Sequence, residues 1–133
     1  LRGGQIDMFF DNTPSILPHI KAGALRALAI TGAQRSTHLP EVPTMQEAGF
    51  TDFVIAPWFG VMAQKKTPAH IIERLNKAFN EALSDPVVLR QFADMDVKAG
   101  GGTSEDFRTH IRAETRRWGE LVRARGIRAE ELK

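Results

Sequence analysis

The chain has 133 residues, 42% hydrophobic and 26% charged, which fits one compact domain or part of a larger protein and excludes a disordered or collagen-like chain. The formal net charge of +2, from 18 basic and 16 acidic residues, is small for a nucleic-acid-binding protein. The absence of cysteine excludes disulfides, thiolate metal sites and cysteine nucleophiles.

The first part of the chain predicts a strand, a helix and a second strand. An apolar run over residues 6–10 leads into residues 11–14, where capping side chains are followed by a proline suited to a first helical turn. The predicted helix ends at Gly23, and residues 25–31 form an apolar run typical of a buried strand. The core-facing positions of the helix are Ile16, Leu17 and Ile20.

The middle of the chain is punctuated by prolines. A stiff segment over residues 39–43 precedes a Thr-x-x-Glu capping pattern at residues 44–47, which predicts a short helix ending near residue 49. Two further strand-like runs, 53–55 and 58–63, follow. Pro57 separates them and removes an amide donor, which predicts a break or a crossing at that point.

The second half of the chain has helical periodicity. Residues 67–68 (Thr-Pro) predict an N-cap and first turn for one helix, and residues 85–86 (Asp-Pro) predict the same for another. A short strand is expected at residues 97–99. A capping pattern at residues 103–106 begins a last long helix that ends at Gly126. The predicted order βαβ(α)ββααβα is an α/β pattern.

The turn formed by Asp11, Asn12 and Thr13 is the first candidate for a binding site. It lies between a predicted strand and a predicted helix, and ligands of open α/β sheets bind at this edge. The positive end of the helix dipole suits a carboxylate, whereas Asp11 would accept hydrogen bonds from a ligand hydroxyl, an amine or a bridging water. The alternative is that Asp11 or Asn12 only caps the helix.

Trp58 and Phe59 form the second candidate group. They begin the apolar run after Pro57 and could line a cleft as an aromatic wall against an organic ligand. Neighbouring residues of a strand face opposite sides, so only one of the two rings can point into a cleft. Packing in the core is the alternative.

Other chemistries have less support. Asp106, His110 and Glu114 share one helical face, but such a row is more often a solvated surface with local ion pairs, so no metal is expected. Glycines 100–102 lack the spacing of a phosphate-binding loop and are expected to form a flexible turn. Arginines of the last helix alternate with glutamates, which favours a solvated face over nucleic-acid binding. No nucleophile motif occurs, so no catalytic residue or cofactor is expected.

Several segments together resemble one protein family. They are GQIDMFFDNTPSILPHIKAGALRALAIT at residues 4–31, Arg35, LPEVPTMQEAGF at residues 39–50, WFGVMA at residues 58–63, KKTPAHIIERLN at residues 65–76, and LSDP at residues 83–86. In this order they resemble the Bug family, also called the TctC family. Its members are periplasmic solute-binding proteins of tripartite tricarboxylate transporters.

This resemblance implies part of a type II periplasmic-binding-protein fold, in which two α/β lobes close on a ligand. The chain would be the C-terminal part of such a protein. Residues 1–57 would finish the second lobe, and residues 58–133 would complete the first lobe after a hinge crossing. The start on LRGG, without a signal-peptide pattern, is also expected of part of a longer protein. The family pattern carries an aspartate at the position of Asp11, which favours the binding site there.

The resemblance further implies a periplasmic receptor that captures a small organic acid, without chemistry or a cofactor, and delivers it to membrane transporter subunits. One alternative is a ligand-sensing protein that acts on a signalling partner. Another is a small hydrolase that uses Asp11 with His19. We also expect the chain alone to self-associate, because uncovered apolar strands would leave open edges.

Overall fold

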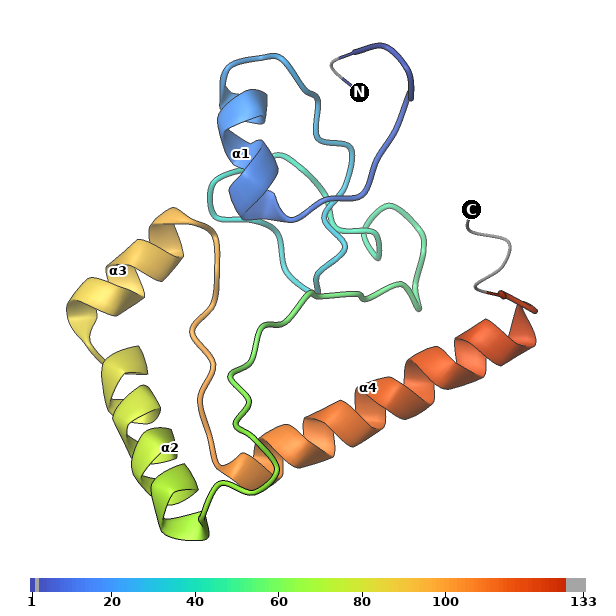
Figure 1. Cartoon of the computed structure of the whole chain (residues 1–133). Helices are drawn as coiled ribbons and strands as arrows, with labels where there is room; N and C mark the ends of the chain where they lie inside the picture. Colours follow the sequence, from blue (N-terminus) through green and yellow to red (C-terminus); the bar gives the residue numbers. More distant parts are fainter. Residues whose placement is uncertain (2, 129–133) are drawn as a thin grey trace. The chain divides into compact units, whose positions relative to one another are not determined.

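The computed structural model describes residues 1 and 3–128, which contain four α-helices. These are α1 (Thr13–Lys21), α2 (Ala69–Leu83), α3 (Pro86–Asp94) and α4 (Ser104–Ala124) (Figure 1). The chain forms two compact units. The first contains Leu1–Met62 and Pro86–Ala99, and the second contains Ala63–Asp85 and the chain from Gly100 onward. Helices α1 and α3 thus belong to the first unit, and α2 and α4 belong to the second.

Helix α1 begins and ends where its capping signals predict. A proline lies in its first turn. At the other end the Gly23 amide donates to the Ile20 carbonyl at 2.9 Å, and the Ala24 amide donates to the His19 carbonyl at 2.9 Å. This pair of bonds requires a left-handed residue between them, and Gly23 provides it with φ 70°. The predicted helix is confirmed.

The core of the first unit is a small cluster formed by α1 and the segment after Ser36. Leu17, Leu39 and Val42 are its buried members, with 5%, 5% and 6% of their surfaces exposed. Ile20, Ala27 and Ile30 pack against the cluster and are partly buried. Leu17 and Ile20 thus take the predicted core positions, whereas Ile16 is half-buried and lies outside the cluster.

The predicted strands do not form within the part of the chain that the structure describes. Residues 6–10, 25–31, 53–55, 58–63 and 97–99 are not assigned as strands. Among the described residues, the β-pairing is one isolated parallel bridge between Ile30 and Thr44. In that bridge the Ile30 amide donates to the Pro43 carbonyl and the Met45 amide donates to the Ile30 carbonyl, both at 2.8 Å. The expectation of strands is wrong here because a strand needs a whole row of donors and acceptors on its neighbour, and these segments find no such row.

The capping pattern at residues 44–47 forms, but the predicted short helix does not. The Glu47 amide donates to Thr44 Oγ1 at 3.2 Å, and the Thr44 amide donates to Glu47 Oε2 at 2.8 Å. The Phe50 amide then closes onto the Met45 carbonyl at 3.0 Å, with Gly49 at φ 100°. A helix-ending bond therefore follows the cap within one turn, and residues 44–49 form a hydrogen-bonded turn.

The helices of the second half lie close to their predicted bounds. Helix α3 begins at Pro86, as expected. Helix α4 begins after Thr103 with a complete capping box to Asp106 and ends before Gly126, which has φ 64°. Only α2 departs from its expected start, because Pro68 instead of Thr67 occupies the N-cap position. A capping box thus marks the start of α4, whereas prolines mark the starts of α2 and α3.

Much apolar surface is open to solvent in both units. In the first unit, Phe9, Phe10 and Met62 have 61%, 61% and 73% of their surfaces exposed. In the second unit, Leu75 and Phe79 of α2 have 43% and 44% exposed, and neither α2 nor α4 contains a buried residue. Such area favours self-association, which stays a prediction. Within residues 1 and 3–128, no helix is long and apolar enough to cross a membrane.

Candidate functional site

The predicted binding turn lies at the exposed N-terminus of α1. The Asn12 amide donates to Asp11 Oδ1 at 2.8 Å, and the Asn12 carbonyl accepts from the Ser15 amide at 3.1 Å and from Ser15 Oγ at 2.8 Å. Asn12 occupies the N-cap position, but its side chain makes no cap hydrogen bond. Thr13, the first residue of the helix, is half-buried. The three residues are therefore adjacent, and the described bond of the Asp11 carboxylate is to its neighbour instead of to the amides of the first turn.

This geometry combines a carboxylate with the positive end of a helix. The peptide dipoles of α1 favour negative charge near its N-terminus, either that of Asp11 or that of a ligand. Because Asp11 is exposed, its carboxylate is open to further donors such as water or a hydroxyl group. The arrangement suits binding of a polar or anionic molecule.

The aromatic candidates lie in the same compact unit as α1, in the segment that follows Pro57. Trp58 has 40% of its surface exposed and Phe59 has 80%. The Phe59 ring is thus the more open of the two. The structure places Trp58 and Phe59 in a different segment from Asp11, and their role as an aromatic wall stays a prediction.

The hydrolase alternative requires Asp11 and His19 to meet, and α1 keeps them apart. Asp11 precedes the helix, whereas His19 lies in its last turn. From Thr13 to His19 the helix rises about 9 Å at 1.5 Å per residue, and Asp11 lies two residues before its start. Proton transfer between two side chains needs hydrogen-bond distance, so this pair is not a catalytic dyad.

Asp106 and Glu114, two members of the row on α4 that was not expected to bind a metal, are held by local bonds. Asp106 belongs to the capping box with Thr103, and Glu114 accepts from Trp118 Nε1 at 3.0 Å and lies 3.6 Å from Arg117. The two Thr103 hydrogen bonds, first from its hydroxyl and then from its amide, lower the pKa of Asp106. Across the described residues no group of three or more histidines and carboxylates is placed to hold a metal ion.

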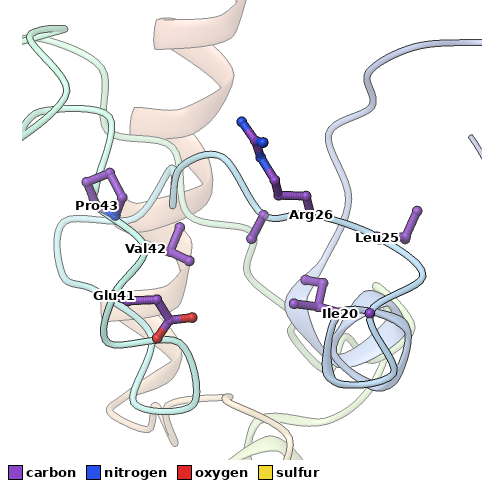
Figure 2. A pocket seen from close by; sticks show the side chains of 8 residues that line it. Ile20, Leu25, Arg26, Glu41, Val42 and Pro43 are labelled. Carbon is purple, nitrogen blue, oxygen red and sulfur yellow. The ribbon is translucent and has the colours of Figure 1, made fainter.

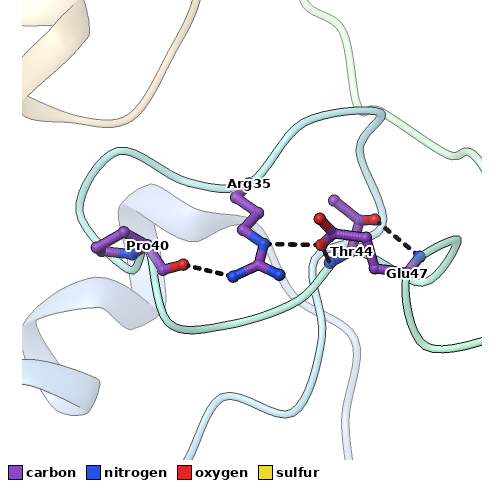
Figure 3. Close-up of polar contacts among 4 residues, drawn as sticks. All are labelled: Arg35, Pro40, Thr44 and Glu47. Carbon is purple, nitrogen blue, oxygen red and sulfur yellow. Dashed lines mark hydrogen bonds and ion pairs between the residues drawn. The ribbon is translucent and has the colours of Figure 1, made fainter.

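Arg35 and Glu47 tie together the segment that carries Leu39 and Val42 (Figure 3). Arg35 Nε donates to Glu47 Oε2 at 2.8 Å, and an Arg35 terminal nitrogen donates to the Pro40 carbonyl at 2.8 Å. Glu47 Oε2 also accepts from the Thr44 amide. One guanidinium and one carboxylate thus close both ends of the LPEVPT segment, and we call this set the Arg35–Glu47 latch.

The latch lowers the pKa of Glu47 below its ordinary value of 4.5, chiefly through the Arg35 hydrogen bond and then through the Thr44 amide. A carboxylate whose pKa is lowered in the folded state adds stability above the unfolded pKa, and this stability is lost as pH falls through the folded pKa. Since both partners are largely solvent-exposed, with 43% and 46% of their side chains accessible, the effect is modest.

We expect Glu47→Gln to lower the free energy of unfolding at pH 7, because the charged hydrogen bond to Arg35 is lost. The difference from the parent should begin to shrink as pH falls below about 4.5, where Glu47 becomes protonated in the unfolded state, and should vanish only below the lowered pKa of the folded state. Urea unfolding at pH 7 and at pH 3 measures both effects. Glu41→Gln, in the same segment, is the control and should change stability little at pH 7. A deficit of Glu47→Gln that is the same at both pH values would contradict a latch held by ionised Glu47.

A cavity of about 450 Å³ opens in the first unit beside α1 (Figure 2). Its lining combines apolar side chains with one guanidinium and one carboxylate; the residues are Ile20, Gly23, Leu25, Arg26, Ala27, Glu41, Val42 and Pro43. Glu41 points into the opening toward α1, whereas Arg26 stands at the rim. None of the predicted site residues lines this cavity. Sequence reasoning missed it because residues 20–27 and 41–43 meet only in the fold, although Arg26 is the lone charge in an apolar run.

Comparison with known proteins identifies the family. Residues 1–127 match the model of the family described as tripartite tricarboxylate transporter family receptor. The chain belongs to this family. Protein BugT of Bordetella pertussis is 44% identical over 128 residues, which cover 96% of this chain and 39% of BugT. The chain therefore spans about two fifths of the length of this curated relative.

Two solved structures show the same fold. Rpa4515 of R. palustris, solved with adipate, aligns with a TM-score of 0.87 and 33% identity over 96% of this chain and 42% of its own. The periplasmic binding protein BugD aligns with a TM-score of 0.85 and 29% identity over 96% of this chain and 43% of its own. The expected fold, part of a periplasmic binding protein, is thereby confirmed. The family is described as a receptor family and BugD as a periplasmic binding protein, which agrees with the expectation of a binding function instead of an enzymatic one.

Proposed function

We propose that the protein acts as a periplasmic solute-binding receptor that captures a small organic acid for a tripartite tricarboxylate transporter. The observation that carries this proposal is the alignment with the adipate-containing structure of Rpa4515 over 96% of the chain. The family match over residues 1–127 supports the receptor role, and the name of the family supports the transporter as partner.

The turn at Asp11, Asn12 and Thr13 is the proposed ligand site of this chain. The N-terminus of α1 would favour a ligand carboxylate, while Asp11 would accept from a ligand hydroxyl or from a water that bridges to the ligand. Trp58 and Phe59 would supply apolar cover for the carbon skeleton of the acid. In this proposal residues 1–57 and 58–133 contribute to the second and the first lobe of the receptor.

A chimera tests the proposal with a known ligand. Residues 1–128 would replace the aligned part of Rpa4515, and adipate binding would be measured by calorimetry and by thermal unfolding. We expect one site per chain and a rise in stability of about 2.7 kcal/mol at an adipate concentration 100 times the Kd, without turnover of adipate. Hexanoate, which has one carboxylate less, is the control and should bind more weakly.

Two results of the chimera experiment would contradict parts of the proposal. A chimera that folds as cooperatively as Rpa4515 and yet shows no adipate-dependent stabilisation would contradict a site for dicarboxylates in this chain. Binding of adipate with no loss on mutation at the start of α1 would keep the receptor function and reject the site. The signalling alternative stays a prediction, to be tested with a sensor ectodomain and the ligand-bound chimera.

A further inference from the structure

Three consecutive glycines, residues 100–102, precede α4 in the second compact unit. Gly101 has φ 129° and Gly102 has φ 112°, backbone values that residues with side chains rarely adopt. Because glycine has access to many backbone conformations, such a segment needs contacts from elsewhere in the chain to hold it in one of them.

Asn80 of α2 binds the last glycine of this segment, Gly102. Asn80 Oδ1 accepts from the Gly102 amide at 2.8 Å, and Asn80 Nδ2 donates to the Gly102 carbonyl at 3.0 Å. The side-chain amide thus pairs with both polar groups of one glycine, as a neighbouring strand would. Asn80 Nδ2 also donates to the Asn76 carbonyl at 2.8 Å, one turn earlier in α2, which fixes the orientation of the amide.

Asn76 supports the same contact. Its Nδ2 donates to the Gly102 carbonyl at 2.9 Å, so this carbonyl accepts from two asparagines. The approach of Asn80 is also close, because a Cβ atom added to Gly101 would lie 2.9 Å from Asn80 Oδ1. Both asparagines are half-buried, although Leu75 and Phe79 of the same helix are exposed. In this chain, therefore, α2 holds the glycine segment with polar side chains.

The hydrogen bonds at Gly102 are followed directly by those of the capping box that begins α4. Thr103, the residue after Gly102, accepts from the Asp106 amide at 3.1 Å and donates from its own amide to Asp106 Oδ2 at 2.8 Å. Helices α2 and α4 touch, but neither contains a buried residue. In the described part of the chain, α2 and α4 thus bury no side chain fully, whereas hydrogen bonds at Gly102 link α2 to the residue two positions before α4.

We propose that Asn80, supported by Asn76, anchors the glycine segment: it fixes Gly102 on α2 and thereby sets where α4 begins. This anchor lies within the second unit. This inference does not depend on the identity of the ligand, and its failure would leave the proposed receptor function untouched.

Hydrogen exchange of the Gly102 amide tests the anchor in the chain itself. Asn80→Ala removes the acceptor of this amide and one donor to the carbonyl, and we expect exchange at Gly102 to rise about tenfold or more. Asn76→Ala is the matched control. It leaves both Asn80 bonds in place and should raise exchange less than about threefold. Amides in the middle of α2 and of α1 should keep their parent rates in both variants.

Distances between spin labels on α2 and α4 test whether the anchor sets the start of α4. The chain has no cysteine, so labels at Arg74→Cys on α2 and Arg112→Cys on α4 are unambiguous. Asn80→Ala should broaden the distribution of this distance, and Asn76→Ala should not. If Asn80→Ala unfolds the second unit, Asn80→Asp serves instead, because it keeps the acceptor for the Gly102 amide and loses the donor to the carbonyl. Parent-like exchange at Gly102 in Asn80→Ala, or an unchanged distance distribution in the Asn80 variant that folds, would overturn the proposal.

Discussion

Replacing Asp11 with alanine in the chimera with Rpa4515 is expected to weaken adipate binding by about 5- to 150-fold. In a closed cleft, a water or ligand group that donates to Asp11 would lose its acceptor, and an unpaired buried donor costs about 1–3 kcal/mol. Thermal stability without ligand should stay within about 0.5 kcal/mol of the parent, because the described bond of Asp11 is to the neighbouring Asn12 amide and not to the first turn of α1. Calorimetry and thermal unfolding measure the two quantities separately.

Two controls separate binding from helix capping. Asp11→Asn keeps the side-chain shape and one acceptor oxygen while it removes the charge, so it shows whether the charge itself matters. Asp7→Ala removes an exposed carboxylate of the preceding segment and should leave adipate affinity unchanged. If Asp11→Ala binds adipate like the parent and unfolds about 1 kcal/mol more easily, Asp11 is a capping residue and the site assignment is wrong.

The helices could be predicted from the sequence because their ends are determined by neighbouring residues. The Thr103 and Asp106 capping box and the left-handed Gly23 and Gly126 act within four or five residues of each other. Such signals work in any chain that contains them. The one misplaced start, at Thr67, is off by a single residue because a following Pro68 fits both the cap and the first turn.

Whether the predicted strands form could not be decided from the sequence, because the hydrogen-bond pairing of strands depends on segments that are distant in the sequence. Residues 25–31 have a buried-strand pattern, but within the described chain they form the isolated bridge at Ile30 and one bond from the Ile55 amide to the Thr31 carbonyl, and no strand is assigned there. The apolar pattern shows that both faces of the segment can be buried. It does not show which other segment of the sequence would pair with it to complete a sheet. The chain spans about two fifths of the length of BugT. The sequence patterns therefore predict strands that this part of the sequence does not form in the structure.

The side-chain contacts likewise divide into those between sequence neighbours, which could be predicted, and those between distant residues, which could not. The adjacency of Asp11, Asn12 and Thr13 at a helix start follows from sequence order and is present in the structure. The Arg35–Glu47 latch joins residues twelve positions apart, and the anchor at Gly102 joins residues that are 22 and 26 positions apart. No sequence pattern within a few residues predicts such pairs. They become visible only when the fold brings the side chains together.

The two tryptophans allow each unit to be followed separately during unfolding. Trp58 lies in the first unit and Trp118 in the second. In a Trp118→Phe background, fluorescence reports the first unit through Trp58. The reverse background, Trp58→Phe, reports the second unit. Urea unfolding in both backgrounds thus locates the effect of any core substitution.

Leu17→Ala is expected to destabilise the first unit by about 2–3 kcal/mol, a large fraction of the stability of a small domain. Leu17 belongs to a cluster with only two other buried apolar residues, Leu39 and Val42, among the described residues. The cost falls in the lower part of the range for leucine truncation because the surrounding Ile20 is only partly buried and can close over the gap. Ile16→Ala, outside the cluster, should cost less than about 1 kcal/mol. Equal losses for the two variants, or a shift in the Trp118 transition alone, would mean that this cluster is not the core that stabilises the first unit.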